Sequence, residues 1–341
     1  MHLAQTNYEE VESDCQNVPP TKFNTCFHTV EEIPVHGSTN HLSRPSEAPY
    51  SFERWLPLVL KTRKLDPKAA QIVKLTRAEA KLVVAASGTS IITGEHNRAY
   101  QEDIQEEIIP HLSSLEFPAE GLFMRLDRCS PKDGCQAVPV IRLITSQRAR
   151  NEISKSLEEG NPTVDLTFLP FNKRMGSEKE YRVYCAPETV AISAVSQYCW
   201  HKPWRFDREE LENQTRVVDQ IWEGIQKIHK SILHDLDPND RLDQLLSKQG
   251  LPFDVFYDET DETSQLVELN VFGARSGCGS CLFHWINDWD QLYGHCERVE
   301  FRVTRGNKKH TGVDVVTATS LDGWTKPFGP QDLMLVPPAR V

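Results

Sequence analysis

The sequence predicts an α+β fold in which antiparallel hairpins alternate with helices. Two segments, residues 180–197 and 251–271, each consist of two strand-like runs joined by a turn. Between them, residues 207–233 carry apolar side chains at helical spacing, which predicts a long amphipathic helix. This mixed order is typical of an α+β protein rather than of a regular doubly wound sheet.

Further elements are predicted outside these segments. Residues 50–60 form a short helix or an extended segment packed on a core, and residues 102–115 form a helix that Pro110 kinks or ends early. Short apolar runs predict the remaining strands, at residues 82–86, 121–126, 164–171, 299–304 and 313–319.

The composition excludes several classes of protein. Of the 341 residues, 39% are hydrophobic, which is enough for a sizeable core. The net charge of -11 argues against a non-specific nucleic-acid binder, which normally presents a basic face. The nine cysteines are odd in number and scattered, so we expect reduced thiols in a cytoplasmic protein. We see no signal peptide and no apolar run long enough to cross a membrane, and we expect no membrane partner.

The first 49 residues differ in composition from the rest. Residues 1–49 are polar, rich in Asn, Ser, Thr and Pro, and show no sustained period. This pattern predicts a flexible arm, or a segment that orders on contact with a partner.

Three oxygen-bearing side chains of the second hairpin are predicted to share one face. Glu268 and Asn270 are two apart in a predicted strand, so they point to the same side. Asp254 alternates with Phe253 and Val255 in the preceding strand and can meet them there. Mg²⁺ prefers oxygen ligands and commonly takes one or two carboxylates with phosphate oxygens. The alternative is an ordinary solvated sheet face, which spacing alone favours.

Two arginines stand on otherwise apolar predicted strands. Arg125 lies in GLFMRL and Arg182 lies in EYRVYC. Such a side chain points outward to water, the commoner case, or inward to an anion. Two of them beside a set of carboxylates favour an anion site. The chain has no GxGxxG motif and no Walker A loop, so a nucleotide would be held by other means.

Four segments carry a resemblance to a known family. They are YSFERWLPLVL from Tyr50, FMRLDRCSPKD from Phe123, EYRVYCAPETVAISAVSQ from Glu180, and FDVFYDETDETSQLVELNVFGARSGCGSCLFHW from Phe253. In this order and at these separations they resemble the cell-division-cycle protein 123 family. Each motif alone is weak, but four in order are fairly specific.

The resemblance implies an ATP-grasp fold, in which two α+β lobes clamp ATP, with Mg²⁺ as a second cofactor. The lobes are expected at residues 50–160 and 161–320, followed by a proline-containing tail at 321–341. Carried over by motif, Arg125 takes the place of a phosphate-contacting Lys, and Arg182 faces the phosphates; these are the implied catalytic residues. The other implied residues are Leu166, Phe168 and Leu169 at the adenine hinge, Gln197 at the cofactor, and Asp254, Glu268 and Asn270 at the metal.

The chain also departs from the family pattern. Glu268 stands where the family has Asp, and Val271 stands where it has Pro. A glycine- and cysteine-rich loop follows, from Gly273 to Cys281. These departures indicate a divergent member with a changed partner or substrate.

Two other motifs have alternative interpretations. Cys278 and Cys281 form a CxxC that could bind zinc or be redox active, although reduced loop cysteines are the default. The segment from Tyr198 to Arg205 is aromatic and basic, so it could stack the bases of single-stranded RNA, but a packed loop is the commoner case.

Three functions are compatible with these features. The first is an ATP-dependent assembly factor for translation initiation factor 2, which the family resemblance implies, with a subunit of that factor as the protein partner. The second is an ATP-grasp ligase that activates a carboxylate or phosphate end, with a peptide or RNA acceptor. The third is a pseudo-enzyme that binds nucleotide without turnover.

Overall fold

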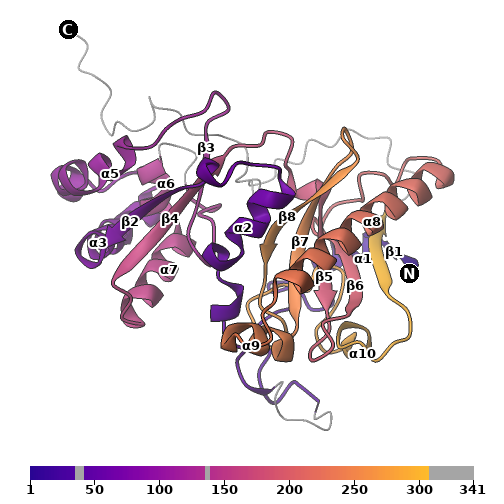
Figure 1. The fold of residues 1–341 in the computed structure, drawn as a ribbon. Helices are drawn as coiled ribbons and strands as arrows, with labels where there is room; N and C mark the ends of the chain where they lie inside the picture. Colours follow the sequence, from indigo (N-terminus) through magenta and orange to yellow (C-terminus); the bar gives the residue numbers. More distant parts are fainter. Residues whose placement is uncertain (35–41, 135–138, 307–341) are drawn as a thin grey trace. The chain divides into compact units, whose positions relative to one another are not determined.

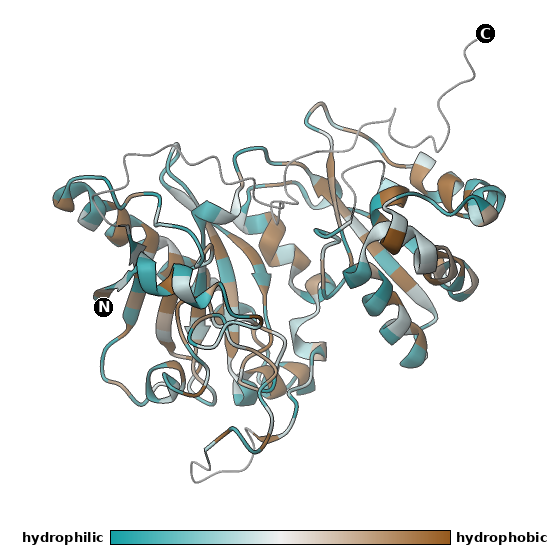
Figure 2. Ribbon diagram, turned by 180° about the vertical axis from the view of Figure 1, so that it is seen from behind, coloured by the Kyte–Doolittle hydropathy of each residue, from teal (hydrophilic) through white to brown (hydrophobic). Residues whose placement is uncertain are grey.

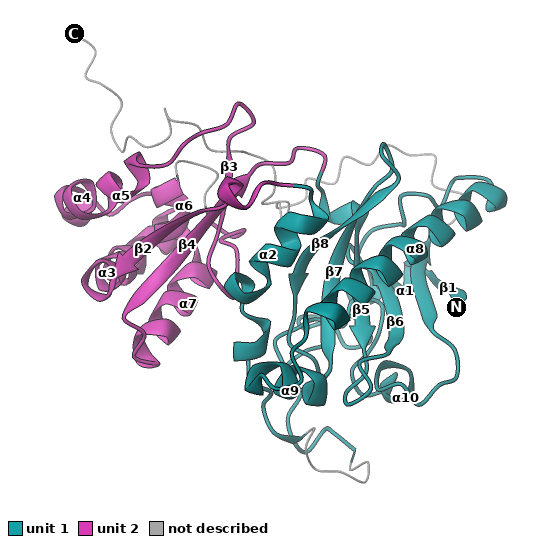
Figure 3. Ribbon diagram, viewed as in Figure 1, with its two compact units in different colours: residues 1–64, 175–314 teal, residues 65–174, 315–341 magenta. Residues whose placement is uncertain are grey.

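The computed structural model describes residues 1–34, 42–134 and 139–306. They form two compact units, drawn in different colours in Figure 3. The first unit contains the described residues up to 64 and from 175 to 306, and the second contains those from 65 to 174. The second unit is therefore an insertion into the first, and the chain does not divide near residue 160 as predicted. The predicted strand at 313–319 and the tail at 321–341 lie outside the described residues.

The first unit is built on a six-stranded sheet with the order β1-β9-β6-β5-β7-β8 (Figure 1). Strands β6, β5, β7 and β8 are antiparallel to their neighbours, whereas β9 runs parallel to both β6 and β1. The two predicted hairpins are confirmed as β5–β6 and β7–β8. The strands are β1 (His2–Asn7), β5 (Glu180–Cys185), β6 (Ile192–Gln197), β7 (Leu251–Asp258), β8 (Thr263–Leu269) and β9 (Glu300–Arg305).

Helices cover this sheet. The predicted long helix is α8 (Leu211–Asp235), which packs on β7 and β8 through an apolar stripe that includes Ile221, Ile225 and Ile228. Figure 2 shows apolar and polar residues alternating along it. Helix α2 (Phe52–Thr62) packs against β8, and this settles the prediction for residues 50–60 as a helix. The shorter helices are α1 (Tyr8–Asp14), α9 (Arg241–Gln249) and α10 (Trp289–Leu292).

The N-terminal residues 1–34 are part of the first unit, not the flexible arm that composition predicts. Strand β1 pairs with β9 along its whole length, from His2 opposite Glu300 to Asn7 opposite Arg305. The prediction missed this pairing because β1 and β9 are almost 300 residues apart in sequence, and local composition carries no signal for a pairing between distant strands. The chain then continues through α1 and runs along the loop at residues 274–285.

The second unit has a three-stranded antiparallel sheet with the order β2-β4-β3. Helices α3, α6 and α7 pack with one another in this unit, and α3 contacts β2 and β4. One buried apolar cluster joins the sheet and the helices. The elements are β2 (Gln71–Thr76), α3 (Arg77–Thr93), α4 (Gln101–Asp103), α5 (Ile109–Ser113), β3 (Leu122–Arg125), α6 (Pro139–Thr145), α7 (Gln147–Glu158) and β4 (Thr163–Pro170).

Two sequence predictions need correction in this unit. Residues 82–86, predicted as a strand, lie in α3, because a short apolar run cannot distinguish a buried strand from a buried helix face. The helix begins at a capping box, in which Thr76 and Glu79 each accept a hydrogen bond from the other's main-chain N–H. The helix predicted at 102–115 forms as α4, a π-helical turn (Ile104–Ile108) and α5, with Pro110 in the first turn of α5, where its missing N–H costs little.

Across the described ranges, no helix is both long and apolar enough to cross a membrane.

Candidate functional site

Three ionisable side chains form a row across neighbouring strands of the six-stranded sheet. Arg182 of β5 lies directly opposite Asp254 of β7, and Asp254 lies directly opposite Glu268 of β8. Because directly opposed residues point to the same side of a sheet, the three side chains share one face. The structure thus brings together three of the residues that the sequence assigns to phosphate and metal.

Arg182 and Asp254 form a two-pronged ion pair at the centre of this row. The Arg182 Nε lies 2.8 Å from Asp254 Oδ1, and Nη2 lies 2.7 Å from Oδ2. The side chains are 7% and 1% exposed, so solvent screens the pair little. Burial alone would lower the pKa of Arg182, but the Asp254 carboxylate raises it well above its ordinary value. The guanidinium therefore stays charged at every pH at which the protein is folded.

Asn270 adds a third group to the pair. Its Nδ2 donates to Asp254 Oδ2 at 3.0 Å, and its main-chain N–H donates to the Pro252 oxygen at 2.7 Å. Within the described ranges, the side-chain oxygen of Asn270 accepts no hydrogen bond. This oxygen is available to a ligand, whereas both oxygens of Asp254 are engaged.

A β-bulge sets the position of Glu268. Asp254 pairs with Glu268, but the next residue, Val255, pairs with Leu266, so Val267 is the extra residue of β8. Leu266 and Val267 are consecutive and both buried. The strict alternation assumed from sequence therefore fails at this point.

The glycine- and cysteine-rich loop completes the surroundings of Arg182. The Arg182 Nη1 donates to the Gly279 oxygen at 2.8 Å and lies 3.2 Å from Cys278 Sγ. On another side the guanidinium carbon lies 5.0 Å from the centre of the Tyr198 ring. Sequence reasoning left this loop without a role, since it lies almost a hundred residues from Arg182. The one available signal was its unusual density of Gly and Cys.

The two loop cysteines are buried free thiols. Burial raises the pKa of the Cys278 and Cys281 thiols to about 12, so both are protonated at neutral pH. In the part of the chain that the structure describes, no cluster of three or more His, Cys, Asp or Glu could hold a metal ion. The interpretation of reduced, buried cysteines fits this geometry.

Gln197 has a structural place beside the row. Its Nε2 donates to the oxygens of Cys199 and Lys202 at 2.9 and 2.8 Å, and its Oε1 accepts from the Thr304 N–H at 2.8 Å. Its amide thus ties the segment after β6 to β9. The assignment of Gln197 to the cofactor remains a prediction.

The aromatic and basic segment from Tyr198 to Arg205 is packed on the first unit. The Trp204 Nε1 donates to the Tyr181 hydroxyl at 3.0 Å, and Trp204 is 4% exposed. Trp200 packs against a small cluster that contains Phe23 and Leu282. These contacts favour the packed loop over a surface on which bases stack.

The remaining predicted residues belong to the second unit. Arg125 at the end of β3 is 6% exposed, and its guanidinium donates to the main-chain oxygens of Leu126 at 3.2 Å and Asp127 at 3.4 Å. Leu166 and Phe168 lie in the apolar core of that unit, on its central strand. Leu169, on the same strand, is 1% exposed. Their roles toward a nucleotide remain predictions, because each unit is described by itself.

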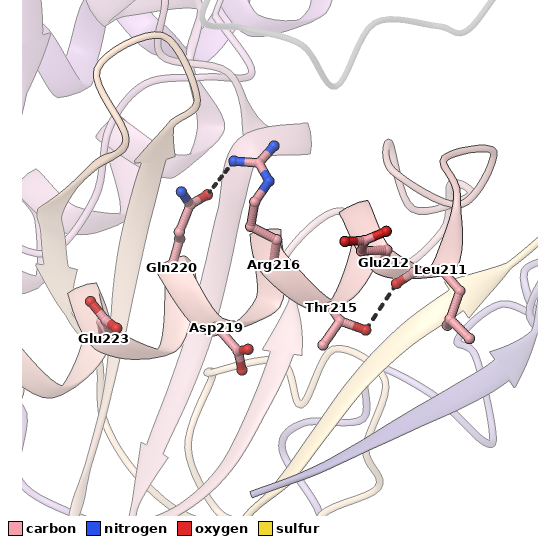
Figure 4. A pocket seen from close by; sticks show the side chains of 7 residues that line it. All are labelled: Leu211, Glu212, Thr215, Arg216, Asp219, Gln220 and Glu223. Carbon is pink, nitrogen blue, oxygen red and sulfur yellow. Dashed lines mark hydrogen bonds between the residues drawn. The ribbon is translucent and has the colours of Figure 1, made fainter.

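A separate pocket lies on the outer surface of α8 (Figure 4). All of its described lining residues lie in the first half of α8, and none is a predicted site residue. They are Leu211, Glu212, Thr215, Arg216, Asp219, Gln220 and Glu223.

Comparison with known proteins adds a structural similarity. No family model matches the chain, and no curated protein matches it. The structure is similar to that of Cdc123 from Schizosaccharomyces pombe, with a TM-score of 0.49 and 17% identity over 76% of this chain and 96% of that one. A C-terminally truncated Cdc123 from the same organism gives a TM-score of 0.48 and 16% identity, with the same coverage. The similarity to Cdc123 is the resemblance that the sequence motifs predict, and the α+β class follows from the sheets and helices of the two units themselves.

Proposed function

We propose that the chain binds ATP together with Mg²⁺ at the face that carries Arg182, Asp254, Glu268 and Asn270. The observation that supports this most directly is the row of one cation and two carboxylates on adjacent strands. Glu268 lies beside Asp254 on the same face, and Mg²⁺ prefers carboxylate and amide oxygens of this kind.

The donor set fits magnesium in kind. Glu268 and the side-chain oxygen of Asn270 would hold the ion, and Asp254 would join them if Arg182 turned to a phosphate. Bound Mg²⁺ would supply neutralisation of phosphate charge. The chain's own contribution is the Arg182 guanidinium, whose fork holds Asp254 and would suit phosphate oxygens after such a turn.

In the cell, we infer that the protein is an ATP-dependent assembly factor for translation initiation factor 2 or a relative of it. Support comes from the four ordered motifs and from a net charge of -11, which suits a protein partner better than nucleic acid. Gentle affinity purification tests this role: a factor 2 subunit should be recovered stoichiometrically, and its absence would contradict it.

One observation favours binding without turnover as the second candidate. Both oxygens of Asp254 are engaged, by Arg182 and by Asn270, in a nearly solvent-free pair. Such a pair resists exchange, because separating it exposes a buried charge. A ligase, by contrast, should consume ATP when its cognate acceptor is present.

Calorimetric titration of ATP into the purified protein, with and without Mg²⁺, tests the binding proposal. The expected result is saturable binding that requires Mg²⁺. Absence of binding by a protein shown to be folded would overturn it, and the chain would then be a binding module rather than a nucleotide-dependent protein.

A further inference from the structure

The N-terminal residues 23–28 pair with the loop that holds Arg182. Main-chain hydrogen bonds join the two segments in antiparallel order: Asn24 N–H to the Cys281 oxygen (2.7 Å), Ser280 N–H to the Thr25 oxygen (3.2 Å) and Phe27 N–H to the Ser276 oxygen (2.9 Å). The two segments are far apart in sequence: residues joined by their side-chain hydrogen bonds are separated by 255 to 257 positions.

Thr25 is the centre of this contact. It is 7% exposed, and its main-chain N–H donates to Ser280 Oγ at 2.9 Å. Its hydroxyl accepts from the Trp285 N–H at 3.1 Å and lies 3.2 Å from Ser280 Oγ. One side chain therefore fixes the end of the loop and the residues that follow it.

Two glycines of the loop are matched to the same N-terminal residues. A Cβ on Gly277 would come within 2.6 Å of the Phe27 ring, and a Cβ on Gly279 would collide with the side chain of Asn24. A larger residue at either position would require the Phe27 ring or the Asn24 side chain to move away from the loop. Close approach of the N-terminal segment thus explains these two glycines of the loop.

The loop in turn holds the guanidinium of Arg182. Nη1 contacts Cys278 Sγ and the Gly279 oxygen, and the opposite edge of the same group holds Asp254. Hydrogen bonds therefore join Thr25 to Ser280, and the adjoining Cys278 and Gly279 to Arg182, which in turn holds Asp254.

We propose that residues 23–28 are a positioning segment for Arg182, so that Thr25 acts through the loop on the charge pair and on Mg²⁺-dependent nucleotide binding. The effect on nucleotide binding rests on the proposed function, whereas the link between Thr25 and Arg182 does not. Thr25 touches none of the row residues, so its effect is transmitted by the loop.

Exchange of the Arg182 Nε proton, followed by NMR on the full chain, tests the link. Thr25→Val removes the hydroxyl and leaves the buried Trp285 N–H without its acceptor. We expect the Arg182 signal to shift and its exchange to accelerate by at least about fivefold, the effect of losing one hydrogen bond. Thr25→Ser keeps the hydroxyl and should behave as wild type, as should Thr29→Val at the exposed position directly after the segment.

The outcomes separate a positioning role from a merely structural one. If Thr25→Val lowers the melting temperature but leaves the Arg182 signal and exchange unchanged, the proposal is overturned. If that variant does not fold, Asn24→Gly gives the same comparison with a smaller shift, because it removes the side-chain bond to the Cys281 N–H and tolerates the φ of 50° at this position. With ATP and Mg²⁺ as probes, Thr25→Val should weaken binding about fivefold. Wild-type protein that binds no ATP would defeat the proposed function, and the Arg182 exchange would still decide the link.

Discussion

Two buried carboxylates of the first unit are stabilised in different ways. Asp254 is 1% exposed and is neutralised by the opposite charge of Arg182. Asp14, at the end of α1, is 3% exposed and accepts hydrogen bonds from the main-chain N–H groups of Thr21, Lys22 and Phe23 at 2.9 to 3.0 Å. Asp14 thus orders a turn with neutral donors, whereas the charge of Asp254 is balanced by one buried cation, with Asn270 as a further donor.

The difference bears on function. A carboxylate held by main-chain dipoles is a fixed structural element, because its partners cannot move without unfolding the turn. Asp254 is held instead by the side chains of Arg182 and Asn270, which can change rotamer without unfolding the strands, at the cost of exposing a buried charge. This contrast is why we place the ligand site at Asp254 and a structural role at Asp14.

The largest predicted effect is at the ion pair. Arg182→Met or Asp254→Asn leaves a buried charge without its partner and should lower the free energy of unfolding by about 3–5 kcal/mol. The double variant Arg182→Met/Asp254→Leu should recover much of this loss, since an apolar replacement of a buried pair is often tolerated. Tryptophan fluorescence in urea can measure it, because all described tryptophans belong to the first unit. If the double variant lost as much free energy of unfolding as the single variants do, Asp254 would not depend on the charge of Arg182.

Removing the charge of Asp14 should cost less. Asp14→Asn loses charge-assisted bonds but keeps an acceptor, so we expect a loss of about 1–3 kcal/mol, confined to the N-terminal turn. Hydrogen exchange of the amides of residues 21–23 should accelerate, while the amides of β7 should not. Glu10→Gln, on the exposed side of α1, is the matched control.

The same carboxylate predicts a pH dependence. Burial alone would raise the pKa of Asp14, but the N–H donors of Thr21, Lys22 and Phe23 lower it below its ordinary value. The contribution of ionised Asp14 to the stability of the fold is therefore complete above its unfolded pKa of about 4. It is lost as the pH falls through the lower pKa of the folded state. Protection of the turn amides should fall in this acid range in wild type, and less in Asp14→Asn. Identical acid profiles would contradict the assignment.

The smallest effect is expected at His284. Burial lowers its pKa, and the neighbouring His28, with ring centres 5.2 Å apart, lowers it further. Because the folded protein prefers neutral His284, its contribution is present above the unfolded pKa of about 6.5 and declines as the pH falls below it. Melting temperatures of wild type and His284→Gln should therefore converge between pH 7.5 and 5.5. A difference in melting temperature that stays constant over this pH range would contradict a titration of His284 linked to folding.

The sequence was sufficient for the parts of the fold with local signals. The hairpins β5–β6 and β7–β8 follow from alternation and turn residues, and α8 follows from its long apolar stripe. The β7–β8 hairpin also placed Asp254 and Glu268 on one face, because register follows from a hairpin. The position of Arg182 opposite Asp254 depends on the pairing of β5 with β7, which joins two separate hairpins.

The parts it missed depend on contacts between distant residues. Pairing of β1 with β9 and of Thr25 with Ser280 joins opposite ends of the chain, and neither end shows a pattern that requires the other. The bulge at Val267 and the capture of Asp254 by Arg182 arise from tertiary packing. Residues 82–86 were misassigned because periodicity cannot distinguish buried strands from buried helices over five residues.

The most direct measurement of the central claim compares Glu268→Gln with wild type in titrations of ATP at several Mg²⁺ concentrations. Glu268→Gln removes a carboxylate charge and keeps the side-chain shape, so the protein should stay folded while Mg²⁺-dependent affinity falls by about tenfold or more. Glu262→Gln, in the exposed turn of the same hairpin, should bind as wild type. If Glu268→Gln binds Mg²⁺ and ATP as tightly as wild type does, the row on β5, β7 and β8 is not the metal site.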